Sequence, residues 1–185
     1  MFGFLKKILG SKSDKDLKEI YPLVDKINTE FDKLKGISDE DLRGKTESFK
    51  LKIKESLKET DDEIKSLKNK YEVSEGSLDE KEEILNSIDK ILEDQNKTIE
   101  NVLNEILPEA FAVVKETARR FSENGSLEVM ATDYDKALSE NKENIRIKGS
   151  KALWLNKWEA AGVSIEWNMI HYDVQLIGGI VLHQG

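Results

Sequence analysis

Apolar residues recur at spacings of three and four along most of the first 120 positions, which is the pattern of amphipathic helices. A first apolar stripe of this kind is crossed by Pro22 and ends before Gly36. A proline inside such a stripe starts or kinks a helix. The pattern therefore predicts a core-facing helix that is disturbed near Pro22. The stripe consists of Leu17, Ile20, Val24, Ile27, Phe31 and Leu34.

A longer stripe follows Ser38, which precedes three acidic residues at positions 39–41. Serine is a favoured N-cap residue, and acidic side chains stabilise the first turn of a helix. We therefore expect a helix to begin here and to continue to about residue 72. Its apolar positions are Leu42, Phe49, Ile53, Leu57, Ile64, Leu67 and Tyr71.

A second long helix is predicted after a break at residues 74–76, because Ser77 and Glu80 have the spacing of a capping box. Two such helices joined by a tight turn form an antiparallel hairpin of coiled-coil type. Its Lys- and Glu-rich faces are interpreted as solvated surface, with a partner-binding arm as the alternative. The second stripe consists of Leu85, Ile88, Leu92, Gln95, Ile99, Val102 and Ile106.

Pro108 fits the first turn of a further helix, over residues 109–121, whose small and apolar side chains indicate burial on more than one side. Arg119 and Arg120 near its end are interpreted as surface ion-pairing residues. The alternative for these two arginines is contact with an acidic partner or a phosphate.

Strand patterns appear only after residue 122. Residues 127–131 form one candidate strand, and residues 144–148 and 151–155 form a candidate β-hairpin around Gly149 and Ser150. Trp154 and Trp158 lie in and beside this hairpin. They either fix the hairpin to the helical body or stack on a ligand near lysines.

Composition narrows the classes of function. A net charge of −8 argues against general nucleic-acid binding. The absence of cysteine excludes disulfides and thiolate metal sites, and His171 and His183 lie too far apart for a helical metal pair, so no metal site is expected. No apolar run approaches the 18 or more residues that a membrane span needs. The N-terminus also lacks the apolar core of a secretory signal, so we expect a cytoplasmic protein.

The first ten residues form a short amphipathic unit in which the apolar side chains share one arc and the lysines lie outside it. We expect this unit to lie on an anionic phospholipid surface, with docking on the protein's own core as the alternative. The residues expected to contact the membrane are Phe2, Phe4, Leu5, Lys6, Lys7, Ile8 and Leu9.

The closing segment sets one amide, Gln175, in an apolar stretch that contains Gly178 and Gly179. A buried glutamine offers a donor and an acceptor side by side, which matches the edge of adenine. Asp173 is expected to cap a helix that begins near Val174. Each glycine inside that helix costs about 1 kcal/mol relative to alanine, so close approach of a backbone or a ligand is expected to offset the cost.

This closing segment also carries a family resemblance. Residues 172–183, Tyr-Asp-Val-Gln-Leu-Ile-Gly-Gly-Ile-Val-Leu-His, are similar to the Phe-Asp-Val-Gln-Leu-Leu-Gly-Gly-x-x-Leu-His run that precedes the phosphate loop in the SecA family. SecA proteins are the ATPase motors of bacterial preprotein export. Residues 37–46 with Phe49, residues 107–116 and the Phe-, Leu- and Lys-rich N-terminus match the same family in the same order.

The resemblance implies a fold and a division into regions. The chain is expected to be predominantly α-helical with a small β-hairpin element, and to be the N-terminal part of a RecA-like α/β domain of the P-loop NTPase class. The expected regions are a lead-in at 1–36, a helical region at 37–121 with a hairpin insertion at about 60–104, a β-containing insertion at 122–166, and the start of the nucleotide-binding core at 167–185. The family implies no role for the two insertions.

The resemblance also implies a function and a site. Gln175 falls on the glutamine that reads adenine, as in the Q motif of DEAD-type helicases, and Met169 and Tyr172 fall where apolar side chains flank the base. The cofactor would be ATP, hydrolysed to drive preproteins through the SecYEG channel. The chain holds no Gly-x-x-x-x-Gly-Lys-Thr loop, so catalytic residues and Mg²⁺ ligands are expected outside it, and the 185 residues alone are not expected to hydrolyse ATP.

The implied partners are the SecYEG channel, preproteins and the anionic lipid of the inner face of the cell membrane, where the protein would associate peripherally. Homodimerisation stays open. The alternative function, from a different class, is a non-enzymatic, membrane-peripheral adaptor built on the helical hairpin, with no nucleotide site.

Overall fold

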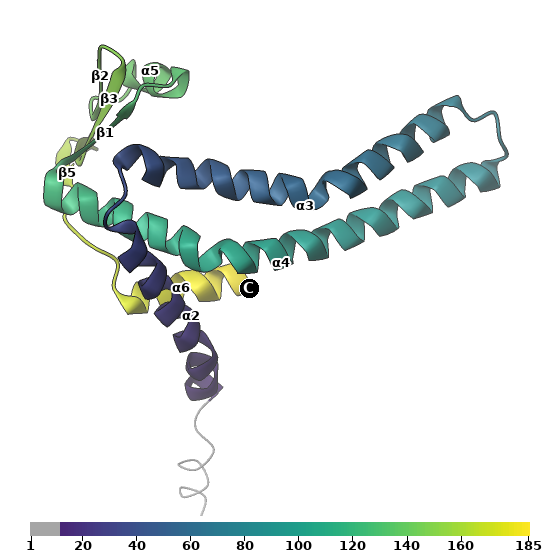
Figure 1. Ribbon diagram of the computed structural model, residues 1–185, viewed down its shortest axis with the longest axis horizontal. Coiled ribbons are helices and arrows are strands. Elements are labelled where there is room, and N and C mark those ends of the chain that lie inside the picture. Colours follow the sequence, from purple (N-terminus) through teal and green to yellow (C-terminus); the bar gives the residue numbers. More distant parts are fainter. Residues whose placement is uncertain (1–11) are drawn as a thin grey trace, which may run out of the picture. The chain divides into compact units, whose positions relative to one another are not determined.

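The computed structural model describes the backbone of residues 12–185 and the side chains from residue 18 onward. Five helices dominate this part of the chain (Figure 1): α2 (Lys12–Leu34), α3 (Asp39–Val73), α4 (Leu78–Asn124), α5 (Asp133–Ser139) and α6 (Asp173–Gln184). The strands are β1 (Ser126–Met130), β2 (Ile145–Lys148), β3 (Lys151–Leu155), β4 (Lys157–Ala160) and β5 (Val163–Glu166). The expected predominantly α-helical character is confirmed, and the strands form small antiparallel sheets.

The chain divides into two compact units. One unit contains the residues as far as Lys45 together with Pro108–Gly185, and the other contains Thr46–Leu107. Both long helices, α3 and α4, contribute one part to each unit. The candidate site lies entirely in the first unit.

The Thr46–Leu107 unit is a helical hairpin, in which the two long helices run side by side in opposite directions (Figure 1). Ser77 N–H donates to Glu80 Oε2 at 3.2 Å and Glu80 N–H donates to Ser77 Oγ at 3.3 Å, so the predicted capping box opens α4. A buried cluster of Ile64, Ile84 and Ile88 forms the apolar contact between the two helices. The hairpin is thus stabilised by apolar burial near its turn and by a cap at the start of α4.

One buried polar side chain ties the same hairpin together further from the turn. Gln95 on α4 is buried, and its Nε2 donates to Thr60 Oγ1 and to Asp61 Oδ1, each at 2.7 Å. Because an unpaired buried amide is costly, these two hydrogen bonds favour one register of the two helices over its neighbours.

The predicted helix start at Pro108 is wrong. Pro108 lies inside α4, which continues unbroken from Leu78 to Asn124, and Pro22 likewise lies inside α2. A proline in a helix interior removes one backbone hydrogen bond and costs about 3 kcal/mol. Burial on both sides of Pro108 offsets that cost, because Leu107 and Ala112 are both buried.

The first unit carries a three-stranded antiparallel sheet in the order β1–β3–β2 and a separate β4–β5 hairpin. The predicted β-hairpin is confirmed: Ile147 pairs with Ala152 and Lys148 with Lys151, around a turn in which Gly149 has φ +60°. That left-handed conformation favours glycine. Helix α5 and the β4–β5 hairpin were not predicted.

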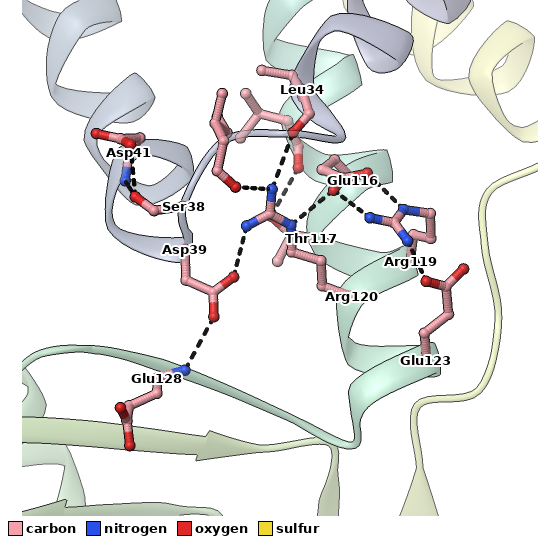
Figure 2. Close-up of polar contacts among 12 residues, drawn as sticks. Leu34, Ser38, Asp39, Asp41, Glu116, Thr117, Arg119, Arg120, Glu123 and Glu128 are labelled. Carbon is pink, nitrogen blue, oxygen red and sulfur yellow. Dashed lines mark hydrogen bonds and ion pairs between the residues drawn. The ribbon is translucent and has the colours of Figure 1, made fainter.

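A buried ionic network joins α2, α3 and α4 within the same unit (Figure 2). Glu116 is fully buried and accepts hydrogen bonds from Arg119 and from Arg120 Nε at 2.7 Å. Burial alone would raise the pKa of Glu116, but the hydrogen bonds and charges of the two arginines outweigh it and hold the pKa below its ordinary value. Glu116 is therefore a buried carboxylate that remains ionised.

Arg120 is not the surface ion-pairing residue that the sequence indicated, because only 5% of it is exposed. Its Nη1 donates to Asp39 Oδ1 at 2.6 Å, and its Nη2 donates to the carbonyls of Leu34 and Ile37 at 3.0 and 2.8 Å. The guanidinium thus caps the carbonyl end of α2, where a positive charge is favoured. With Nε, Nη1 and Nη2 all bonded within the protein, this arginine is poorly placed to bind a phosphate.

Candidate functional site

Helix α6 begins at Asp173, one residue earlier than predicted, and Tyr172 rather than Asp173 is its N-cap. Gln175 is the third residue of the helix, and its side chain folds back over the first turn. Tyr172 N–H donates to Gln175 Oε1 at 2.9 Å, while Gln175 N–H donates to the Tyr172 carbonyl at 2.9 Å. The glutamine therefore satisfies a backbone donor at the helix start, the role that Glu or Gln has in a capping box.

This hydrogen bond fixes the orientation of the Gln175 amide, because only the oxygen can accept from a backbone N–H. The oxygen keeps a second lone pair. No side chain or carbonyl from residue 18 onward accepts from Nε2. The side chain is exposed, which corrects the sequence-based picture of a buried amide. An acceptor and a donor therefore lie side by side in a fixed orientation at an accessible helix start.

The two predicted base-flanking residues lie in the segment just before α6. Tyr172 is 73% exposed, and Met169 is half-buried. The Met169 carbonyl accepts a 2.8 Å hydrogen bond from Trp167 Nε1, and the Trp167 and His171 rings lie 5.9 Å apart. Asn156, which is buried, holds the start of this segment by donating to the carbonyls of Phe121 and Trp167 at 3.1 Å each. The structure thus places all three predicted site residues in one short, anchored segment.

The two glycines of α6 have different surroundings. A Cβ at Gly179 would lie 2.7 Å from Cε1 of Phe111 on α4, whereas a Cβ at Gly178 would meet nothing within 4 Å. At Gly179 the close approach is made by the aromatic side chain of Phe111. Gly179 allows α6 to pack closely against α4.

Two helices, α2 and α4, hold the start of α6. Leu176 and Ile180 are buried, and α6 lies beside α2 (Figure 1). Asn28 on α2 donates to Asp173 Oδ1 at 3.1 Å, and Lys115 on α4 donates to Asn28 Oδ1 at 2.7 Å. Sequence reasoning missed both residues. The available signal was a lysine at position 115 that directly follows the apolar run at residues 110–114.

The two tryptophans that the sequence singled out lie away from these residues, at a cavity of about 660 Å³. Trp154 Nε1 donates to the fully buried Asp135 at 3.1 Å, so this ring is fixed to α5. Arg43 pairs with the same carboxylate at 2.9 Å. Burial would raise the pKa of Asp135, but hydrogen bonds from Thr132 and Arg43 outweigh it and lower the pKa. The structural role is therefore supported for Trp154, while Trp158 stays open to either interpretation.

The residues expected to contact a membrane, from Phe2 to Leu9, lie outside the described residues. Among the helices that the structure describes, none is long and apolar enough to cross a membrane. Within the same part of the chain, no group of three or more His, Asp or Glu side chains is arranged to hold a metal ion.

Comparison with known proteins gives one consistent result. The model of the SecA DEAD-like domain matches residues 5–185. The chain is 48% identical over its whole length to a protein translocase subunit SecA of Cytophaga hutchinsonii, and 48% identical over 98% and 99% of its length to the subunits of Porphyromonas gingivalis ATCC 33277 and Flavobacterium psychrophilum. It spans only 16–17% of the length of these relatives. No solved structure matches the chain.

Proposed function

Because the chain belongs to the SecA DEAD-like domain family, we propose that it forms the adenine-recognising part of an ATP-driven preprotein translocase. The relatives that it matches are named protein translocase subunit SecA. In this proposal the chain is the N-terminal part of a RecA-like domain of the P-loop NTPase class. The insertions at about 60–104 and 122–166 are additions to that domain.

The observation that carries the proposal is the geometry of Gln175. Adenine presents an amine donor, N6, beside a ring acceptor, N7, and a glutamine amide pairs with both at once. Gln175 Oε1 is already held by the Tyr172 N–H and has a lone pair left for N6, while Nε2 is available for N7. Guanine carries an oxygen in place of N6, so the same fixed amide would set two acceptors against each other.

The neighbouring side chains suit a planar base. The Tyr172 ring is largely exposed and provides a π-face, and Met169 provides a polarisable apolar surface in the same segment. ATP bound here would supply the free energy for moving a preprotein. Phosphate-loop and Mg²⁺-binding residues would come from the part of the relatives that this chain does not span.

The partners in this proposal are the preprotein, the SecYEG channel and anionic phospholipid at the inner face of the cell membrane. Residues 1–9, with their apolar arc and lysines, would supply the lipid contact. A short amphipathic segment of this kind binds lipid only weakly by itself, so the channel would have to provide part of the membrane affinity.

The experiment compares ATP and GTP binding by the full-length protein with and without the substitution Gln175→Ala. Loss of both base hydrogen bonds should lower ATP affinity about 10-fold to 100-fold, since a good bidentate pair contributes about 1–3 kcal/mol of discrimination. GTP affinity should change much less. Gln184→Ala is the matched control, because Gln184 is an exposed glutamine at the other end of the same helix.

Unchanged affinities for both ATP and GTP in Gln175→Ala would contradict adenine reading by this residue. Equal losses for both nucleotides would contradict it as well, because they would indicate damage to the phosphate site or to the fold. A selective loss of ATP affinity with Gln184→Ala unaffected would support it.

A further inference from the structure

We propose that Asn28 and Lys115 are positioning residues for nucleotide binding, which hold the first turn of α6 so that Gln175 faces the base. Neither residue belongs to the segment that carries the adenine-reading side chains. The proposal rests on the proposed function of Gln175. It adds a claim that this function does not contain: helix α2 is part of the support of the nucleotide site.

Asn28 is a link whose orientation is dictated by its two neighbours. Its Nδ2 donates to Asp173 Oδ1 at 3.1 Å, and its Oδ1 accepts from Lys115 Nζ at 2.7 Å. A carboxylate can only accept and an ammonium can only donate, so the amide has one orientation that satisfies both. Asn28 thereby joins α2, α4 and α6 through a single side chain.

Lys115 is held by the same set of residues. Its side chain is only 12% exposed, and Nζ lies 5.0 Å from the centre of the Phe31 ring and 3.9 Å from Asp173 Oδ1. A largely buried ammonium is unfavourable unless it is paired and hydrogen-bonded. Asn28, Asp173 and the face of Phe31 together satisfy this need. The buried ammonium of Lys115 therefore stabilises one arrangement of α2 and the start of α6.

Asp173 connects this cluster to the base-reading side chains. It is the first residue of α6 and follows Tyr172, whose N–H holds Gln175 Oε1. Its carboxylate also lies at the positive end of the helix dipole, where a negative charge is favoured. Asn28 and Lys115 both contact Asp173 Oδ1, and they hold the residue that adjoins Tyr172, whose N–H orients the Gln175 amide.

A change at Asn28 or Lys115 should therefore act on nucleotide binding through Gln175. Losing the link lets the first turn of α6 fray or shift, and the directional hydrogen bonds to the base are then partly lost. GTP makes no matched pair with the Gln175 amide and should be less affected. The expected signature is a loss of discrimination between ATP and GTP caused by a residue that touches neither nucleotide.

The test uses the full-length protein and the substitutions Asn28→Ala and Lys115→Met. Methionine keeps an unbranched apolar side chain of similar length and removes the charged donor of Lys115. Lys115→Arg restores a charged donor and should recover most of the lost affinity. Lys45→Met is the control, because Lys45 forms an ion pair at 2.8 Å with Glu109 on α4, and that pair does not include α6.

Two measurements are made on each variant. The first is the dissociation constant for ATP and for GTP. Asn28→Ala and Lys115→Met should each weaken ATP binding by a few-fold up to about tenfold, which is part of the loss expected when the hydrogen bonds from Gln175 to the base are removed. The second is backbone amide exchange at residues 173–177 without nucleotide, which should accelerate in these two variants and not in Lys45→Met.

A double-mutant cycle with Gln175→Ala decides whether the effect passes through that residue. If it does, Asn28→Ala should weaken ATP binding little further once Gln175 is alanine. Full additivity, or unchanged exchange at residues 173–177 in both variants, would overturn the positioning role. The proposed function fails separately, if Gln175→Ala alone leaves the ratio of ATP to GTP affinity unchanged.

Discussion

Phe111 occupies the space that a side chain at Gly179 would need. A Cβ at that position would lie 2.7 Å from Cε1 and 3.1 Å from Cζ of the ring, well inside van der Waals contact. Phe111 lies on α4, one helical turn before Lys115, so the same face of α4 receives the glycine of α6 and holds the start of that helix. Helix α6, which carries Gln175, therefore contacts α4 at two points along its length.

The first prediction concerns the paired glycines. Gly179→Ala should destabilise the chain by about 1–2 kcal/mol, because the new methyl group overpacks against Phe111. Gly178→Ala should instead stabilise it by about 0.5–1 kcal/mol, because the space is open and alanine is the better helix former. Urea unfolding followed by tryptophan fluorescence measures both, since all three tryptophans lie in the unit that contains α6.

The Phe111 ring supplies the control for the two glycine substitutions. In a Phe111→Ala background the methyl group at position 179 has room, so Gly179→Ala should become neutral or stabilising. A destabilisation of the same size in both backgrounds would show that Phe111 is not the cause.

The second prediction concerns the buried carboxylate. Glu116→Gln should lower the free energy of unfolding at neutral pH by about 3 kcal/mol, because it leaves two arginines without their shared anion. Since the folded pKa of Glu116 is below its ordinary value of 4.5, its ionised form contributes fully above that pH. That contribution is lost as the pH falls through the folded pKa.

The pH dependence of the free energy of unfolding distinguishes the effect of the charge of Glu116 from the effect of its shape. Wild type and Glu116→Gln should differ most at pH 7, and the difference should shrink as the pH falls below 4.5 and disappear once it is below the folded pKa of Glu116. Unfolding curves at several pH values check this. A difference that stays constant down to pH 3 would mean that the charge of Glu116 is not what stabilises the network.

Local signals explain which elements the sequence could predict. The Ser77–Glu80 cap and the turn at Gly149 depend on residues only a few positions apart, and both are present in the structure. The helix start predicted at Pro108 is a local inference too, but burial on both sides of the proline outweighs it. In the hairpin, Ile84 is buried and Leu85 is 45% exposed, because packing against the other helix chooses between neighbouring apolar residues.

The residues of the candidate site also differ in whether the sequence could predict them. Gln175 could be identified from the resemblance, since the motif is contiguous and surrounds it. Asn28, Lys115 and Asp173 come from three separate helices, and their meeting depends on tertiary packing. The exposure of Gln175 was also not predictable, because an apolar sequence neighbourhood does not specify which side of the helix the amide occupies.

The third prediction concerns the anchor of α5. Asp135→Ala should destabilise the chain by about 3 kcal/mol, because it leaves Arg43 without its buried partner and Trp154 without its acceptor. Asp133→Ala should change stability by no more than about 0.5 kcal/mol, since that carboxylate lies in the same first turn but its side chain is 99% exposed. Equal effects of the two substitutions, measured by urea unfolding, would contradict the anchoring role.

The fourth prediction concerns the helical hairpin. Gln95→Ala should weaken it by about 1–2 kcal/mol, because Thr60 and Asp61 lose their shared donor and the hairpin loses a buried pair of hydrogen bonds. Amide exchange within Thr46–Leu107 should accelerate accordingly. The neighbouring exposed Asn96→Ala should leave exchange unchanged. Slow exchange in Gln95→Ala would show that apolar packing alone holds the two helices.

The most direct test of adenine reading is Gln175→Glu in the full-length protein. Glutamate still accepts the hydrogen bond from Tyr172 N–H and suits the positive end of the helix, so α6 should keep its stability. It lacks the Nε2 donor and adds a negative charge facing N7 of the base. Affinity for ATP should therefore fall about 10-fold or more while α6 stays folded. An ATP affinity equal to that of the unmodified protein would contradict adenine reading by Gln175.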